Sequence, residues 1–238
     1  MSADDKPRVA TPGNVDDLIG RLRRRAKKPV GGKNGVSPLG LRKAKTVSDL
    51  GRILALPVRP DTFAPPDLTD RLRKPGGTMR LREIQNRALH EIEQAGGLLG
   101  PIGVGHGKTG VAFLAPLLLK AKRPLLLIPA KMRQQCQADY LIWAAHFDMP
   151  QHLIVRTYEE LSSPRRSAML TVLKPDLIIA DEAHKLRHPN TSRTRRISRY
   201  LKENPDTAFI AMSGTVTRKA ISDYTHLARW ALGERSPL

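Results

Sequence analysis

The sequence predicts an α/β fold in which a mainly parallel sheet carries helices on both faces. Three observations predict it. Short apolar segments alternate with helical patterns from residue 78 onward. A glycine-rich segment directly follows the first apolar segment, and an acidic pair ends the fourth. Alternation of strands with helices is typical of parallel sheets, whose strands are joined by crossover helices.

The expected strands are the five short apolar segments. Each is bounded by turn residues or charges, as a strand buried on both faces should be. Right-handed crossovers should join them. In chain order the expected strands are residues 96–100, 124–129, 152–157, 176–181 and 207–213. Helical patterns lie before and after them at 82–94, 107–121, 131–147, 158–173, 191–203 and 218–232.

Composition divides the chain near residue 77. Residues 1–77 hold 17 Lys and Arg against 8 Asp and Glu, and nearly a quarter of them are Gly or Pro. Such a segment buries too little apolar surface to offset the loss of chain entropy. We therefore expect residues 1–77 to form a basic, mostly disordered arm and residues 78–238 to form one folded lobe.

The whole chain of 238 residues has a net charge of +19, which favours a polyanionic partner. Only 4% of its residues are aromatic, so nucleic-acid contacts should fall on phosphates rather than on stacked bases. A single cysteine, Cys136, excludes an internal disulfide framework. Neither a secretory signal nor an apolar run long enough to span a membrane is found. We expect a protein of the bacterial or phage-infected cytoplasm that has no membrane partner.

A glycine-rich turn, Gly100-Pro-Ile-Gly-Val-Gly-His-Gly-Lys-Thr109, follows the first strand. Backbone N–H groups in such a turn, together with the positive end of the next helix, suit phosphate groups. Lys108 would reach the β- and γ-phosphates of ATP, and the Thr109 hydroxyl would bind Mg²⁺. The alternative is an ordinary glycine-rich turn, since Ile102 stands where the strict pattern has glycine. The loop residues expected to hold ATP are Gly103, Gly105, His106 and Gly107.

The fourth strand ends in two carboxylates, Asp181 and Glu182. Ligands of open α/β sheets bind at the carboxyl ends of the strands. Asp181 would hold Mg²⁺, and Glu182 would orient or deprotonate an attacking water. The alternative is a surface turn with two acids. The position of the pair at a strand end, 73 residues after Lys108, favours a nucleotide site.

These motifs resemble the first RecA-like lobe of superfamily 2 helicases and translocases that contain a DEAH box, and the subfamily resembled is Swi/Snf. The glycine loop GVGHGKT and residues 181–184, DEAH, carry the resemblance. The resemblance implies a RecA-like P-loop three-layer sandwich that hydrolyses ATP in a DNA-dependent way. Further matches follow the family's order, at LREIQ (81–85), LLLIPAK (125–131), IVRTYEEL (154–161) and SGT (213–215).

The resemblance also implies roles for single residues. Gln85 would contact the adenine base, and Lys131 and Thr157 would lie along the backbone of duplex DNA. Arg193 begins a set of arginines, with 196 and 199, on one side of a helix. That side would either track a phosphate backbone or simply be solvated. The residues expected to couple nucleotide state to DNA binding are His184, Ser213 and Thr215.

Motors of this family have a second RecA-like lobe that supplies an arginine finger, and the chain ends at Leu238. We therefore expect an ATP-binding lobe of a DNA-dependent ATPase that needs a second lobe, on another chain or missing from this one, for full hydrolysis. The alternative is a non-catalytic, nucleotide-gated DNA-binding or regulatory subunit. A third class, a phosphotransferase or GTPase with a P-loop, is disfavoured by the DEAH sequence and Gln85.

Overall fold

A computed structural model of the chain describes residues 64–214 and 221–236. Most of the basic arm expected over residues 1–77 therefore lies outside the described residues, and so does Thr215. The described residues belong to one compact unit, Arg52–Leu238.

The centre of this unit is a five-stranded, wholly parallel sheet with the order β1-β5-β4-β2-β3. Each of the five expected apolar segments contains one strand, and the α/β class is confirmed. The strands are β1 (Leu98–Gly100), β2 (Pro124–Ile128), β3 (Ile154–Thr157), β4 (Leu177–Asp181) and β5 (Ala208–Met212).

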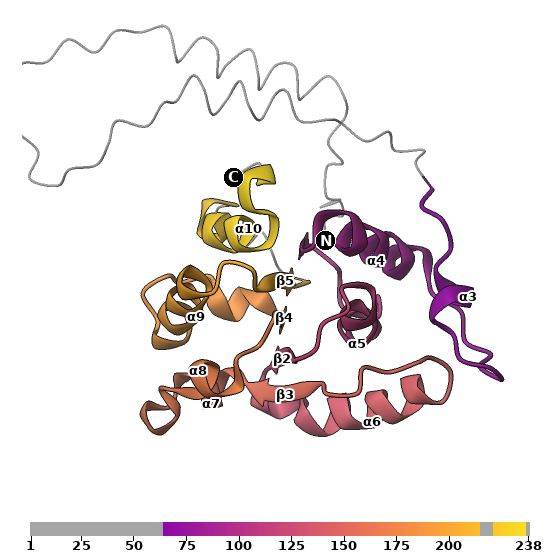
Figure 1. Ribbon diagram of the computed structural model, residues 1–238, viewed down its shortest axis with the longest axis horizontal. Helices are drawn as coiled ribbons and strands as arrows, with labels where there is room; N and C mark the ends of the chain where they lie inside the picture. The colour runs from indigo at the N-terminus through magenta and orange to yellow at the C-terminus, as the bar shows by residue number, and fades with distance from the viewer. Residues whose placement is uncertain (1–63, 215–220, 237–238) are drawn as a thin grey trace, which may run out of the picture. The chain divides into compact units, whose positions relative to one another are not determined.

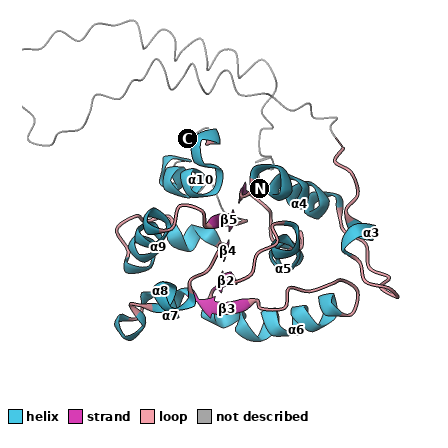
Figure 2. Cartoon of the chain, in the orientation of Figure 1, coloured by secondary structure: helices cyan, strands magenta, loops and turns pink. Residues whose placement is uncertain are grey.

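Helices cover both faces of the sheet, as Figures 1 and 2 show. The path from β1 to β2 to β3 runs across the sheet in one direction, and the path through β4 to β5 returns. Right-handed crossovers therefore place the connecting helices of the two paths on opposite faces. One face carries α4 (Glu83–Ala95), α5 (Lys108–Leu118) and α6 (Arg133–Ala144). The other carries α7 (Tyr158–Ser162), α8 (Met169–Leu173), α9 (Ser192–Glu203) and α10 (Thr225–Leu232).

The hydrophobic core has two halves, one on each side of the sheet. Along β2, Leu126 and Ile128 point toward α4, α5 and α6, while Leu125 and Leu127 point toward α7, α8 and α9. Both sets are at most 2% exposed. Side chains alternate between the faces of a strand, so a strand covered on both faces is apolar at every position.

Several of the expected helices are broken or shorter in the structure. The pattern over 158–173 divides into α7, a 3₁₀ turn η2 (Pro164–Arg166) and α8. Pro164 is the reason, because its ring and missing N–H cannot continue the helix from α7. The remaining 3₁₀ turns are η1 (Ala130–Met132), η3 (Ala183–Leu186), η4 (Ile221–Tyr224) and η5 (Gly233–Arg235).

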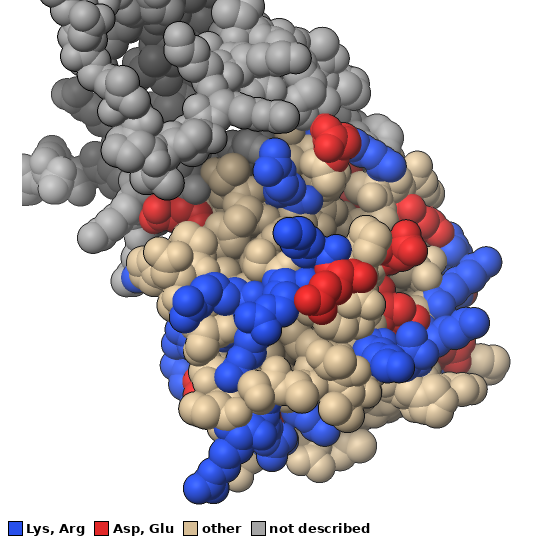
Figure 3. Space-filling view, turned by 60° about the vertical axis from the view of Figure 1, so that its left-hand side comes forward, with Lys and Arg blue, Asp and Glu red and all other residues tan. Residues whose placement is uncertain are grey.

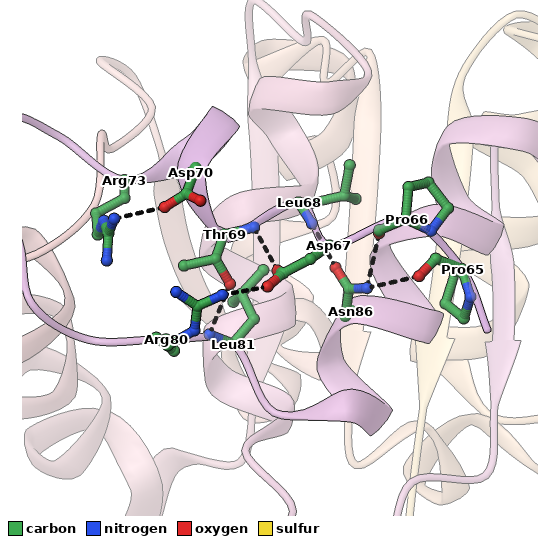
Figure 4. A network of polar contacts seen from close by, with 10 residues as sticks. All are labelled: Pro65, Pro66, Asp67, Leu68, Thr69, Asp70, Arg73, Arg80, Leu81 and Asn86. Atoms are coloured by element: carbon green, nitrogen blue, oxygen red, sulfur yellow. Dashed lines mark hydrogen bonds and ion pairs between the residues drawn. The ribbon is translucent and has the colours of Figure 1, made fainter.

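Residues 64–82, which we call the N-terminal strap, pack on the lobe and include the short helix α3 (Thr69–Leu72). Figure 4 shows its polar contacts. Asn86 of α4 accepts a hydrogen bond from the Leu68 N–H and donates one to the Pro66 carbonyl, both at 2.7 Å. The Thr69 hydroxyl accepts from the Leu81 N–H at 3.1 Å. Composition predicts that the folded lobe begins at residue 78. In the structure it begins earlier, because residues of the strap are bonded to α4.

Candidate functional site

The glycine loop and the acidic pair meet at the carboxyl ends of β1, β5 and β4, which are neighbours in the sheet. From this edge β1 continues into α5 on one face, whereas α10, which follows β5, lies on the other. Two neighbouring strands whose connections leave toward opposite faces open a crevice at their carboxyl ends, and ligands of α/β proteins bind there.

The glycine loop, residues 101–107, connects β1 to α5. Gly107 immediately precedes α5 and has a φ of +77°, a left-handed conformation that disfavours side chains with a Cβ. Lys108 and Thr109 form the first turn of α5, where backbone N–H groups lack helical partners. Ile102, the departure from the strict phosphate-loop pattern, is only 4% exposed and belongs to the core beside α4 and α5. It anchors the start of the loop.

Two side chains from the start of α4 hold the glycine loop. The Gln85 Nε2 donates to the Gly107 carbonyl at 2.9 Å, and the Arg82 guanidinium donates to the Gly105 carbonyl at 2.6 Å. The Gln85 Oε1 accepts from the Arg82 N–H at 2.9 Å. Gln85 was expected to contact a base. In the structure it is 3% exposed, its Nε2 supports the loop and its Oε1 caps the start of α4.

Lys108 spans the distance between the glycine loop and the acidic pair. Its side chain is 9% exposed. Its Nζ donates to the Gly103 carbonyl at 3.3 Å and lies 3.6 Å from Oε1 of Glu182. The structure therefore places this ammonium between the loop and the end of β4. His106, by contrast, is exposed at the loop surface.

Asp181 is the last residue of β4 and is 5% exposed. Burial raises the pKa of its carboxyl to about 6, with a further contribution from Glu182, while Lys108 acts in the opposite direction. The buried Tyr158 hydroxyl donates to the Asp181 carbonyl at 2.7 Å and fixes the strand end. Loss of hydration also raises the pKa of Tyr158 well above its ordinary value, so the phenol remains a donor.

Glu182 and His184 form a small polar cluster with Ser213, which follows β5. The His184 Nδ1 lies 3.1 Å from the Glu182 Oε2 and 3.1 Å from the Ser213 Oγ. Burial lowers the pKa of His184 despite the nearby Glu182, so the imidazole is neutral at pH 7. Because both oxygens meet the same nitrogen, the cluster lacks the relay geometry of a Ser-His-acid hydrolase, which uses both ring nitrogens.

The segment that follows β5 is bonded to the end of β1 and packs against the glycine loop. The Ser213 N–H donates to the Gly100 carbonyl at 3.1 Å. Gly214 lies so close to the loop that a Cβ built on it would stand 3.2 Å from the Val104 nitrogen. Movement of the loop and movement of the β5 end are therefore mechanically linked.

The three residues expected at DNA are spread over different elements. Lys131 is exposed in η1, just beyond the end of β2. Thr157 is 3% exposed, and its hydroxyl accepts from the Glu160 N–H at 3.1 Å as the cap of α7. Arg193 is half-buried, and its Nε has no hydrogen-bond partner among the described residues. Only Lys131 presents an exposed charge of the kind that phosphate contact requires.

Two contributors to this site were not identified from the sequence, Arg82 and Tyr158. A signal existed for Arg82, because it directly precedes α4 and Gln85 follows three residues later, the spacing of a capping box. For Tyr158, the first residue of α7, the sequence carries no such signal, since its partner, Asp181, is 23 residues away at the end of β4.

The chain matches no protein-family model, and no curated protein resembles it closely enough to count as a match. No helix among the described residues combines the length and apolar character that crossing a membrane requires.

Proposed function

We propose that the glycine loop and the acidic pair bind a nucleoside triphosphate, ATP by resemblance, in a RecA-like first lobe. The observation that carries the proposal is the position of Lys108, whose ammonium lies between the Gly103 carbonyl and the Glu182 carboxylate. Phosphate oxygens would replace both partners and accept further hydrogen bonds from the N–H groups that begin α5.

Oxygen donors at this edge suit Mg²⁺. The buried Asp181 carboxyl, whose pKa is about 6, is a group that a dication would ionise, and Thr109 would add a hydroxyl oxygen. The bound ion would neutralise charge on the phosphates. Glu182 would then orient or deprotonate the attacking water, and His184 and Ser213 would hold its carboxylate in place. Hydrolysis would be coupled to duplex DNA and completed by a second lobe.

Binding of labelled ATP by K108A, E182Q and the parent chain tests this proposal. We expect K108A to lose at least tenfold in affinity, because a phosphate loses its cation. Replacing the exposed Lys122 by Ala removes the same charge far from the loop and should change nothing. Equal ATP affinity of K108A and the parent chain would contradict the nucleotide site.

One observation favours a second candidate, a nucleotide-gated subunit without hydrolysis. The Glu182 carboxylate already contacts Lys108, His184 and Ser213, which leaves little of it to activate water. An ATPase assay with and without duplex DNA separates the two candidates. A catalytic Glu182 predicts that E182Q is about 10²–10⁴-fold slower than the parent chain. Equal rates for the two, with ATP still bound, favour the gated subunit.

A further inference from the structure

The outer side of α9 carries three cations in a row. Arg195, Arg199 and Lys202 are all exposed, and their spacing of four and three residues puts them on one side of the helix. The opposite side, with Ile197 and Tyr200, is buried in the core. We call the three exposed cations the α9 stripe.

Among the described residues, the α9 stripe has no counter-ion. No ion pair or hydrogen bond within residues 64–214 and 221–236 engages any of its three side chains, and Glu203, the one acidic residue of α9, makes no ion pair with them. Elsewhere on the lobe, Arg133 and Arg166 both pair with Glu160, so an exposed arginine here is not unpaired by default. Figure 3, which brings the side carrying α9 forward, shows many Lys and Arg side chains on this face, with acidic side chains at its centre and right.

Hydrogen bonds fix the position of α9, the helix that carries the stripe. The Arg196 guanidinium, on the flank of α9, donates to the Leu161 carbonyl at 2.5 Å and to the Ser163 carbonyl at 2.8 Å. These bonds fasten α9 to the end of α7, beside η2 and its exposed Arg165. A rigid helix presents its cations at constant spacing, which lowers the entropy cost of binding a regularly charged partner.

We propose that the α9 stripe is a second binding surface of this lobe, for the phosphate backbone of a duplex nucleic acid. Arg195 and Lys202 are seven residues apart, roughly 10 Å along the helix axis. About three phosphates of one strand occupy that length of duplex, one for each cation of the stripe. The surface has no aromatic side chain for base stacking, so it is indifferent to sequence.

Other polyanions fit less well. A helix that binds a membrane surface presents an apolar side to the lipid, and the apolar side of α9 is buried in the core. An acidic polypeptide lacks the fixed charge spacing of a duplex. The proposal does not depend on ATP binding, because the stripe shares no residue with the glycine loop or the acidic pair.

The test uses the full chain and a fluorescent 20-base-pair duplex at several salt concentrations. The stripe variant carries R195Q, R199Q and K202Q. A matched control, K120Q with K122Q and K174Q, removes the same charge from exposed lysines in the turns that precede β2 and β4. Because both variants keep residues 1–63, any binding by that segment is common to them.

We expect the stripe variant to bind the duplex at least tenfold more weakly than the parent chain. The slope of log affinity against log salt concentration should become less steep by about three. The control should keep the parent's slope to within about one. ATP binding should be equal in all three proteins, so a failure here is distinguishable from a failure of the nucleotide site. Equal losses in both variants, or no loss in either, overturn the proposal. Competition by poly-glutamate as strong as that by unlabelled duplex would also overturn it, in favour of an acidic protein.

Discussion

Asp181 illustrates how a single buried group links the site to stability. Its carboxyl has an ordinary pKa of 3.8 and a folded-state pKa of about 6, because burial disfavours the charge. A pKa raised by folding stabilises the fold below the unfolded-state value, and this stabilisation disappears as the pH rises through about 6. The free energy of unfolding should therefore fall by about 2–3 kcal/mol between pH 4 and pH 8 because of this group alone.

The D181N variant tests that prediction by denaturant unfolding at pH 4 and pH 8. An amide keeps the acceptor for the Glu182 N–H, which lies 3.0 Å away, and cannot ionise. From pH 4 to pH 8, the free energy of unfolding of the parent chain should fall by about 2–3 kcal/mol more than that of D181N. The exposed Asp206 supplies the control, since D206N should follow the parent chain. Parallel pH curves for D181N and the parent would contradict a raised pKa at this position.

Gly107 provides a second residue-level prediction. A Cβ at this position would stand 2.1 Å from the Gln85 Nε2, in addition to the cost of a left-handed φ. At Gly76 the φ is +82° and a Cβ would meet nothing within 4 Å. G76A therefore measures the backbone cost alone, about 1–2 kcal/mol, and G107A should cost more than that in unfolding experiments.

Only G107A should also weaken ATP binding, because displacement of Gln85 frees the glycine loop. Adding Q85A to G107A should recover part of the lost stability, since the smaller side chain removes the clash. Equal destabilisation by G76A and G107A would contradict this prediction, because it would show that the close approach of Gln85 to residue 107 adds nothing to the cost in free energy of unfolding.

Among the elements, the N-terminal strap depends on one side chain of α4. Asn86 is 7% exposed and bonds both the Leu68 N–H and the Pro66 carbonyl. N86A would leave these buried groups without partners, at a cost of about 2–3 kcal/mol. We expect faster proteolysis within residues 64–82 and a lower free energy of unfolding. N190A, at an exposed position, should leave both measurements unchanged.

The strap also shows what the sequence could not reveal. Its Gly and Pro content resembles that of an unfolded arm, and its burial depends on partners in α4 and α6 far along the chain. The five strands were predictable because each is a short apolar run covered on both faces. The helical pattern over 158–173 predicted one continuous helix, although the known effect of proline on helices would have predicted the break at Pro164.

The candidate site was predictable to the extent that it depends on topology. Carboxyl ends of parallel strands share one edge, so the approach of Lys108 to Glu182 follows from motif order and strand direction. The hydrogen bonds that Gln85 and Thr157 make within the lobe could not be predicted from motif order or strand direction. The partner of Gln85 is the Gly107 carbonyl, 22 residues away, and only three-dimensional packing brings the two together.

For the whole molecule, the site's construction predicts how a ligand changes stability. The glycine loop follows β1, the acidic pair follows β4 and Ser213 follows β5, so one bound ligand would contact the ends of three neighbouring strands. Breaking those contacts requires separating the sheet, so binding should oppose global unfolding and not merely a local opening. Mg·ATP at 100 times its dissociation constant should then add about 2.7 kcal/mol to the free energy of unfolding.

Denaturant unfolding with and without Mg·ATP measures this gain, and hydrogen exchange locates it. Slow-exchanging amides of β4 and β5 should be protected together with those that begin α5, because all of them exchange through the same global opening. K108A should show no gain at the same ATP concentration, while the K122A control should match the parent chain. A gain in the parent that is confined to amides of the glycine loop would mean that the ligand holds the loop without engaging the strand ends. Glu182 and Ser213 would then lie outside the binding site.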